Sequence, residues 1–367
     1  MANANGNERQ MTTYRILPAN QVTAEQWAAW SLIQAGNAKI DSPFFSPEFT
    51  RTVGTVRRDV EVAIVEDAGR PVAFFPFQRN GHTAQAIAGR LSEFHGAILD
   101  EDTECSARDL LHSAGIKSWH FDHLPESQTE FGRFSWGSKP SPFIDLMQGY
   151  DTYRAAVKTS GSSVSQAERK ARKMAREIGP LRFEWHDSDS GAFESLVDWK
   201  SAQHRRTRVL EIFKHAWVSD MLAALMAVDS PGFSAPLATL YAGDELVALH
   251  LGICSRDVLH LWFPAYNCEY EKYSPGVILL LRLAEAAANR GIARIDMGPG
   301  EERYKQNFKS GDSPVYEGLI SQSPVTSAAR GIWYHTKRGI RQSRFRTQLE
   351  APLIATRRLR QWLAFQQ

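Results

Sequence analysis

The chain has few cysteines, and they lack the spacing that a metal site needs. Only three occur in 367 residues, Cys105, Cys254 and Cys268. They form neither a metal-ligand pattern nor a disulfide framework. His-x-x-x-His and Cys-x-x-Cys pairs are also absent. We therefore expect no metal cofactor and a reducing compartment.

The chain also lacks long apolar runs. None approaches the ~20 residues of a membrane-spanning helix. The first residues carry Arg9 and no apolar segment of the kind found in secretory signals. These absences predict a cytoplasmic protein.

Three common catalytic motifs are missing as well. There is no Walker loop and no Gly-x-Ser-x-Gly elbow of a serine hydrolase. Gly298-Pro299-Gly300 follows an expected strand, but it lacks the third glycine and the spacing of a dinucleotide-binding fingerprint.

Charge is nearly balanced overall but uneven along the chain. The formal net charge is +2. From Ser321 onward nine basic residues face one acid, Glu350, so this tail carries +8 and the remainder −6. With 43% hydrophobic and 11% aromatic residues, the rest has the composition of a globular protein long enough for two cores.

One stretch, residues 257–310, organises the second half. Residues 258–263 are apolar and β-prone, and residues 292–297 form a second expected strand. Between them Ser274-Pro275-Gly276 gives a strong helix start, and Gly291 ends an amphipathic helix. The stretch therefore predicts a β-α-β unit followed by a glycine turn.

The start of that helix is suited to an anion. We expect the free N–H groups of Gly276, Val277 and Ile278 to face the preceding loop, where a diphosphate would meet the positive end of the helix dipole. An ordinary helix start explains Ser274-Pro275 equally well.

The first half contains a hairpin and a polar loop. Residues 60–65 and 72–77 alternate around a glycine turn and predict two antiparallel strands. Glu93 and His95 lie in a loop where they could bind a polar substrate, and a solvated surface pair is the alternative. Asp122 and His123 adjoin on an expected strand, so we expect them on opposite faces and unpaired.

Two basic segments could contact anions. Residues 150–178 predict a helical connector with a dense cationic face (Arg169, Lys170, Arg172, Lys173 and Arg176). A phosphorylated substrate, an anionic membrane or plain solvation would each suit this face, whereas the lack of interleaved aromatic residues disfavours nucleic acid. Residues 323–367 look helical, basic and aromatic, and could dock on the first half or lie on an anionic membrane.

The middle strand of an expected meander carries a candidate base. In residues 246–253 alternation places His250 beside Ala248 and Gly252, on the face opposite the aliphatic residues, which leaves room for a ligand. A buried histidine satisfied by one hydrogen bond is the alternative. Asp296, beside the glycine turn, could serve as base or simply cap the turn.

The motifs of the second half resemble a known superfamily. Tyr-Ser-Pro-Gly at 273–276, Gly-Ile-x-x-Ile-Asp-Met-Gly-Pro-Gly at 291–300 and Glu-Arg-Tyr-Lys-x-x-Phe at 302–308 look like GNAT acyltransferases. The most similar subgroup is the BioF2-like, or CelD-like, acetyltransferase family of polysaccharide biosynthesis, related to the FemAB transferases. The resemblance is good over residues 181–322, and the first half resembles a degenerate copy.

The resemblance implies an α/β fold with a mixed sheet. It implies two GNAT-like domains in tandem and a helical C-terminal extension. The expected bounds are 11–148 for the degenerate domain, 149–179 for the basic connector, 180–322 for the acyltransferase domain and 323–367 for the tail.

It also implies acetyl-CoA or another acyl-CoA as co-substrate and no metal. The donor would bind where two flanking strands part, and the residues expected to hold it are Phe263, Ser274, Pro275, Gly276, Val277 and Ile278. Only Ser274-Pro275-Gly276 stand in for the usual Arg/Gln-x-x-Gly-x-Gly/Ala loop.

The catalytic and acceptor-binding candidates come partly from the residue patterns above and partly from the resemblance. His250 and Asp296 are the candidate bases, and the FemAB relatives place the motif lysine, here Lys305, near the acyl group. An ion pair with Glu302 is the plainer role for Lys305. The expected acceptor-binding residues are Glu93, His95, Lys200, Glu302 and Tyr304. Lys200 lies near a helix end that is rich in cations. The alternative to a role in acceptor binding is that it complements the negative end of the helix dipole.

The expected function is an acyl-CoA-dependent N- or O-acyltransferase acting on a sugar or nucleotide-sugar in exopolysaccharide biosynthesis. Two alternatives stay open, namely a FemAB-like aminoacyl-tRNA-dependent transferase and a non-catalytic binding module. Expected partners are the small acceptor and, through the basic tail, an anionic membrane, so that the cytoplasmic protein could lie peripherally on the inner membrane; nucleic acid is not favoured.

Overall fold

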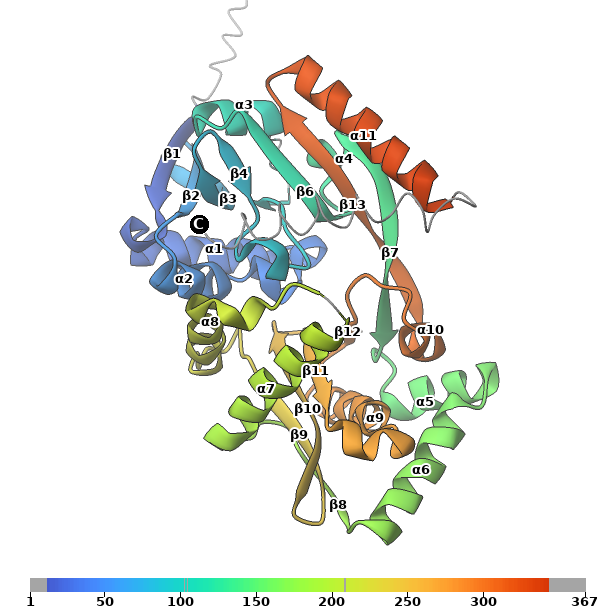
Figure 1. Ribbon diagram of the computed structural model, residues 1–367. Coiled ribbons are helices and arrows are strands. Elements are labelled where there is room, and N and C mark those ends of the chain that lie inside the picture. Colours follow the sequence, from blue (N-terminus) through green and yellow to red (C-terminus); the bar gives the residue numbers. More distant parts are fainter. Residues whose placement is uncertain (1–11, 102, 104, 208, 343–367) are drawn as a thin grey trace, which may run out of the picture.

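The molecule is built on one continuous mixed sheet flanked by helices (Figure 1). The computed structural model describes residues 12–342 except 102, 104 and 208. Arg9, Glu350 and the tail beyond 342 lie outside the described residues. The mixed α/β class expected from the sequence is confirmed.

The strands alternate with helices along the chain. The strands are β1 Thr13–Pro18, β2 Val60–Asp67, β3 Arg70–Asn80, β4 Thr83–Gln85, β5 Ile98–Leu99, β6 Ser118–Pro125, β7 Ser135–Asp145, β8 Leu181–Glu184, β9 Leu237–Ala242, β10 Glu245–Cys254, β11 Val258–Tyr266, β12 Arg294–Asp296 and β13 Gly311–Ser321. The α-helices are α1 Ala24–Gly36, α2 Pro47–Val56, α3 Ala107–Ser113, α4 Thr129–Gly132, α5 Tyr150–Ser160, α6 Ser163–Glu177, α7 Ser190–Thr207, α8 Ala216–Met226, α9 Pro275–Ala288, α10 Arg303–Phe308 and α11 Pro324–Gln342.

Local sequence explains the elements that carry the site. Alternation around Gly69 gives the β2–β3 hairpin, and the β9–β10–β11 meander runs antiparallel as its pattern predicts. Pro275 begins α9 at the first helical position, and Gly291 follows its end with a φ of +79°. Both features of the β-α-β unit are therefore where the sequence predicts them.

The order of the strands joins the two halves of the chain. It runs β1-β2-β3-β4-β6-β13-β7-β12-β11-β10-β9-β8, with β5 beside β3. The strand β13, which lies within the expected bounds of the acyltransferase domain, pairs with β6 and β7 of the first half. The proposed boundaries at 148 and 322 stay a prediction, but the ladder crosses them without a break.

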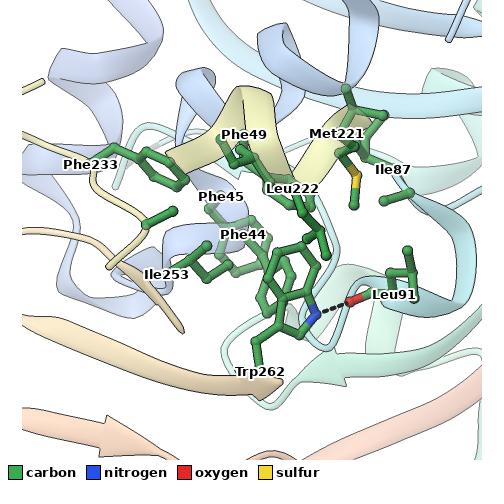
Figure 2. Packing of buried hydrophobic residues seen from close by; sticks show 14 of the residues in the cluster. Phe44, Phe45, Phe49, Ile87, Leu91, Met221, Leu222, Phe233, Ile253 and Trp262 are labelled. Carbon is green, nitrogen blue, oxygen red and sulfur yellow. Dashed lines mark hydrogen bonds between the residues drawn. The ribbon is translucent and has the colours of Figure 1, made fainter. Parts of the chain in front are cut away.

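Helices cover both faces of the second-half sheet. On one face α9 packs with α5 and α6, and their apolar residues surround Ile295 and Leu259. On the other face α7 and α8 contribute to a core shared with α1 and α2 of the first half. Figure 2 shows this shared core, in which Phe44 and Phe49 of the first half meet Trp262 of β11.

The connector and the start of the tail are helical, as expected. The connector breaks into α5 and α6 around Gly161, and α11 is the described part of the tail. Among the described residues, none of the helices combines the length and apolarity needed to cross a membrane.

Candidate active site

Strands β11 and β12 part in the middle of the sheet. They pair in parallel only from Val258↔Arg294 to His260↔Asp296. β11 then runs on to Tyr266, while the chain after Asp296 turns away, and the Met297 N–H donates to the carbonyl of Pro142 instead. The gap expected between two parting strands is therefore present.

A cavity of about 690 Å³ opens at this gap. Its walls come from α7, β10, β11, the first turns of α9 and the segment from Met297 to Lys305. One wall residue, Glu93, comes from the first half. Parting parallel strands are a common place for ligands in α/β sheets, because backbone groups and strand ends converge there.

Glu93 and His260 form a hydrogen-bonded pair at the base of the gap. The Oε2 atom of Glu93 lies 2.7 Å from Nε2 of His260, the last residue of β11 that pairs with β12. The imidazole is fully buried, with the rings of Phe44 and Phe94 edge-on to it. The Glu93 carboxylate also lies over Gly298, so close that a Cβ there would come within 2.0 Å of Oε2.

The Glu93 carboxylate stays ionised. Desolvation raises its pKa, but the hydrogen bond from His260 and the electrostatic influence of the nearby His260, His123 and Lys305 side chains outweigh it and hold the pKa of Glu93 below its usual range. A half-buried, ionised carboxylate at the parting point of the strands can bind an ammonium group.

His250 lies in the cavity wall, but one of its ring nitrogens is already used. Nε2 accepts the backbone N–H of Trp262 at 3.1 Å, so the proton of the neutral ring is on Nδ1. Burial lowers the pKa of His250 to about 3. Gly252 is the small neighbour that the ring requires, since a Cβ there would lie 2.6 Å from Cε1 of His250. This is the buried, hydrogen-bonded histidine of the plainer interpretation.

Asp296 is committed to an ion pair. Its Oδ1 accepts Nε of Arg294 at 2.9 Å, and the same guanidinium reaches Asp41 of the first half at 2.7 Å. Asp296 is buried and does not line the cavity. Its contacts tie the two halves together, whereas a base role would require that pair to break.

Lys305 holds the glycine turn. Its Nζ donates to the carbonyls of Gly298 and Pro299 at 3.1 and 3.2 Å, and lies 3.5 Å from Glu302. Both parts of the sequence hypothesis thus have a geometric counterpart, because the ion pair exists and the ammonium also lies in the wall beside the site.

Tyr304 and Lys200 complete the polar wall. Burial, together with the charges of Glu302 and Glu93, raises the pKa of Tyr304, so its phenol stays protonated. Nζ of Lys200 donates to the carbonyl of Pro264 at 3.2 Å, and burial lowers its pKa to about 8. Both side chains line the cavity, as does Glu302.

The start of α9 offers fewer free amides than expected. The N–H groups of Val277 and Ile278 both donate to the carbonyl of Ser274, at 3.0 and 3.3 Å. The expectation of three free amides is therefore wrong. Of these three N–H groups, only that of Gly276 has no backbone acceptor among the described residues. The reason is a tight first turn, in which Val277 already bonds three residues back.

Ser274, which precedes α9, has a left-handed backbone conformation and is hydrogen-bonded to a lysine. It has φ +54° and ψ +55°, a left-handed conformation that costs a non-glycine residue on the order of 1–3 kcal/mol. Its hydroxyl accepts Nζ of Lys170 from α6 at 2.7 Å. One lysine of the basic connector thus stands at the helix start, where an anion would lie.

Two residues expected to contact the donor lie in the core instead. Phe263 is buried against Trp262 and Phe213 and does not line the cavity. Ile278 is buried on the side of α9 that faces the sheet. Ser274, Pro275, Gly276 and Val277 do line the cavity.

His95 lies apart from this site. It lines a second, smaller cavity that shares no lining residue with the first. Glu93 and His95 therefore face different cavities, although only one residue separates them in the sequence.

Sequence reasoning missed His260 and Lys170 as site residues. The sequence pattern identifies His260 only as part of an apolar strand. A buried histidine within such a strand requires a polar partner, and this requirement is the signal that could have marked it as a site residue. Nothing in the sequence pairs it with Glu93, which is 167 residues away. Lys170 could not be singled out from its basic neighbours.

Comparison with known proteins relates part of the chain to a known family. Residues 162–306 match the family model of an acetyltransferase (GNAT) domain. This segment thus matches a GNAT acetyltransferase domain, the chain is an enzyme of the acyltransferase class, and the GNAT fold implies an acyl-CoA co-substrate. No curated protein gave a significant sequence match.

Solved structures share the fold at low sequence identity. The C-terminal domain named as part of a lysylphosphatidylglycerol synthetase from Agrobacterium fabrum has a TM-score of 0.52 at 14% identity, with 86% of this chain and 96% of that one covered. L-PGS from Bacillus licheniformis has a TM-score of 0.52 at 15% identity, covering 84% and 96%. FemX has a TM-score of 0.57 at 10% identity, covering 83% and 96%. At these identities the likeness shows the fold alone.

Proposed function

We propose that the protein transfers an acyl group from acyl-CoA to a primary amine on a small polar acceptor, with Glu93 as the base. The observation that carries the proposal is the Glu93–His260 pair at the point where β11 and β12 part. An amino sugar or its nucleotide derivative, as in exopolysaccharide assembly, is the acceptor class that the sequence resemblance implies.

The donor fits the open edge of β11. Beyond His260 none of the described strands pairs with β11 on the β12 side, so a pantetheine arm can lie along this stretch, where His250 bonds the N–H of Trp262 and Lys200 bonds the carbonyl of Pro264. The diphosphate would then lie at the start of α9, beside the Gly276 N–H and the ammonium of Lys170. The thioester would end near Glu93.

The charge of Glu93 favours an amine over a hydroxyl acceptor. An alkyl ammonium releases its proton at pH ~10, whereas an alcohol requires a far stronger base than a carboxylate whose pKa is lowered. Glu93 binds the ammonium and takes one proton from it, and the amine attacks the thioester carbon. When the C–S bond then breaks, the remaining excess proton on the nitrogen passes to the departing thiolate, which leaves as the thiol. Tyr304, which stays protonated, can donate a hydrogen bond to the departing sulfur.

Substitution of Glu93 tests the proposal. Glu93→Gln keeps the shape of the side chain and removes the base, so we expect the rate of thiol release from acetyl-CoA with amino-sugar acceptors to fall by about 10²–10⁴-fold. Glu101→Gln, at an exposed glutamate of the first half, is the matched control and should leave the rate unchanged. An unchanged rate in Glu93→Gln would remove the base assignment.

The donor site has its own pair of variants. A Cβ at Gly276 would lie 3.6 Å from Tyr266, so Gly276→Ala fits the space and Gly276→Trp does not. Titration calorimetry should show acetyl-CoA binding lost in the tryptophan variant and kept in the alanine variant. Equal binding by both would place the donor elsewhere.

A different donor is the second candidate. Helix α6 packs beside α9, and Lys170 of its basic face reaches Ser274. This basic face would also suit the phosphates of an aminoacyl-tRNA. The similarity in fold to FemX and to lysylphosphatidylglycerol synthetase makes this donor worth testing. Tight, strongly salt-dependent binding of tRNA, together with no binding of acetyl-CoA, would favour it.

A further inference from the structure

The first half contains a second pair of parting strands. β4 and β6 pair in parallel only at Thr83↔Ser118 and Ala84↔Trp119, after which β6 continues to Pro125. The arrangement repeats that of β11 and β12. A crevice is therefore expected at this point of the first half too.

His95 fills part of this second gap. Its Nε2 accepts hydrogen bonds from the backbone N–H groups of Asp122 and His123, at 3.1 and 3.3 Å. The ring therefore occupies the backbone donors of β6 to which an extended ligand would bind. A pantetheine arm cannot use these amides while the imidazole is there. What is left beside the ring is a cavity of about 150 Å³.

The cavity lies where Asp122 and His123 disturb β6. Leu124 pairs with Tyr316 and Phe121 with Gly318, so Asp122 and His123 together oppose a single residue of β13. This β-bulge brings the two side chains to one side, and Asp122 Oδ1 lies 2.8 Å from His123 Nδ1. The sequence expectation that they stay unpaired is wrong for this reason.

The walls carry charges of both signs. Arg57 uses Nε and Nη2 to bind Asp59, which leaves Nη1 without a hydrogen bond to the described chain, and the exposed Arg90 adds a second cation. Asp122 uses only Oδ1, so Oδ2 has no hydrogen-bond partner among the described residues. Trp217 of α8 packs against Arg57 and closes the cavity from the second half.

Asp122 is an anion under ordinary conditions. Burial raises its pKa, but the hydrogen bond from His123 and the neighbouring imidazoles prevail and hold the pKa of Asp122 well below its usual range. A lone anion in the cavity would meet this carboxylate, and a lone cation would meet Arg57 and Arg90. Only a molecule that carries both charges matches both walls.

The size of the cavity limits the ligand further. A cavity of about 150 Å³ is known to hold a ring of about six non-hydrogen atoms. We propose that this cavity binds a small α-amino acid such as alanine, with its carboxylate toward Arg57 and Arg90 and its ammonium toward Oδ2 of Asp122. The proposal goes beyond the acyl transfer proposed above and does not depend on it.

A metal ion suits the same residues less well. His95, Asp122 and His123 place possible ligand atoms within 4.8 Å of one another. Nε2 of His95, however, is taken by two backbone amides, and Nε2 of His123 lies 3.3 Å from the ammonium of Lys139. A nearby cation opposes a second one.

The loop between the two cavities connects this site to Glu93. The small cavity is lined by Ala86, Ala88, Gly89, Arg90 and His95, whereas Glu93 lines the large one. Ala88 and Gly89 both have a φ of +57°, so the loop is held in a conformation that few residues adopt freely. An amino acid bound on one side would therefore restrict the segment that carries the base on the other.

Titration of the full chain with L-alanine tests the proposal, with propionate and ethylamine as ligands that each lack one charge. We expect saturable binding of alanine, and at least tenfold weaker binding of propionate and of ethylamine. Asp122→Asn, which keeps an acceptor for His123, should weaken alanine binding at least tenfold. Ala86→Leu, which fills the cavity and leaves its charges in place, should abolish it.

Two further measurements keep the result specific. Gly276→Trp, which alters only the large cavity, should bind alanine as the natural chain does. Amide hydrogen exchange across residues 86–95 should slow when alanine is bound. If Asp122→Asn does not fold, the comparison of the three ligands on the unsubstituted chain decides the proposal.

Four outcomes would overturn the inference. These are no detectable binding at 10 mM alanine, equal affinity for propionate, unchanged affinity in Ala86→Leu, and binding of Zn²⁺ that alanine does not oppose.

Discussion

At the scale of single residues, the site depends on a carboxylate that approaches a backbone without a side chain. Oε2 of Glu93 occupies the space that a Cβ on Gly298 would need. Gly298 also has a φ of +68°, which favours glycine on its own account. The position therefore separates two effects, backbone strain and displacement of the base.

Two glycine variants distinguish these effects. Gly298→Ala and Gly291→Ala both introduce a Cβ at positive φ, and each should cost about 1 kcal/mol of the free energy of unfolding. Gly291 has nothing within 4 Å of the new Cβ, so only Gly298→Ala displaces Glu93. We expect acyl transfer to fall at least tenfold in Gly298→Ala alone. Equal rates in the two variants would contradict the placement of Glu93.

Lys200 gives a prediction about stability and pH. Burial lowers its pKa to about 8 in the folded chain, below the ordinary value of 10.5, so between these values the unfolded chain binds more protons and stability rises with pH. Replacing the charge by Lys200→Met should therefore raise the free energy of unfolding at pH 7, and this gain should shrink between pH 8 and 10.5. Denaturant unfolding at pH 7 and pH 10 measures it. A gain that is the same at both pH values would show that Lys200 is not desolvated.

At the scale of elements, the loop from residue 86 to 97 is held from both halves. The indole N–H of Trp262 donates to the carbonyl of Leu91 at 2.7 Å (Figure 2). His260 of the same strand is hydrogen-bonded to Glu93. β11 thus positions a first-half loop, and the loop in turn supplies the second half with its base.

A single change at Trp262 should show this dependence. Trp262→Phe keeps the aromatic packing and leaves the buried carbonyl of Leu91 without its donor, which costs about 1–3 kcal/mol. We expect the rate constant of acyl transfer to fall while acetyl-CoA binding is unchanged, because the donor site does not use this loop. Steady-state kinetics with titration calorimetry measure both. Loss of donor binding with an intact rate constant would contradict the assignment.

The elements of the second half were predictable, because each is set by local signals. Alternation gave β9 to β11, and Ser274-Pro275 with Gly291 gave α9. The polar contacts were not predictable in the same way. His260 and Glu93 are 167 residues apart, and the sequence around either residue does not indicate that the other is its partner. Alternation also failed at Asp122–His123, since a bulge changes the face of a side chain without altering the sequence period.

At the scale of the whole molecule, the two sequence halves do not correspond to two independent sheets. The path of strands places β13 between β6 and β7, and Arg294 bridges Asp41 and Asp296 across the halves. The shared core that includes Trp262 adds apolar contacts to these polar ones. The resemblance implied two tandem domains. It could not show that a strand of the second half, β13, pairs with strands of the first half.

The shared sheet predicts cooperative unfolding. Because β13 loses both ladder partners if the first half unfolds, neither half should be stable without the other. We expect one calorimetric transition whose calorimetric and van't Hoff enthalpies agree within error. Two resolved transitions, or an enthalpy ratio well above one, would show that the halves unfold separately.

The position of β13 also has a consequence for biosynthesis. β7 has no ladder partner within the first half, because its neighbours in the sheet are β12 and β13. A nascent chain that has just extended past Asp145 therefore exposes an unpaired strand edge until residues 146–321 have been translated, roughly 10–35 s at ~5–20 residues per second. During that interval the growing polypeptide would be a natural client for chaperones that shield strand edges at the ribosome exit.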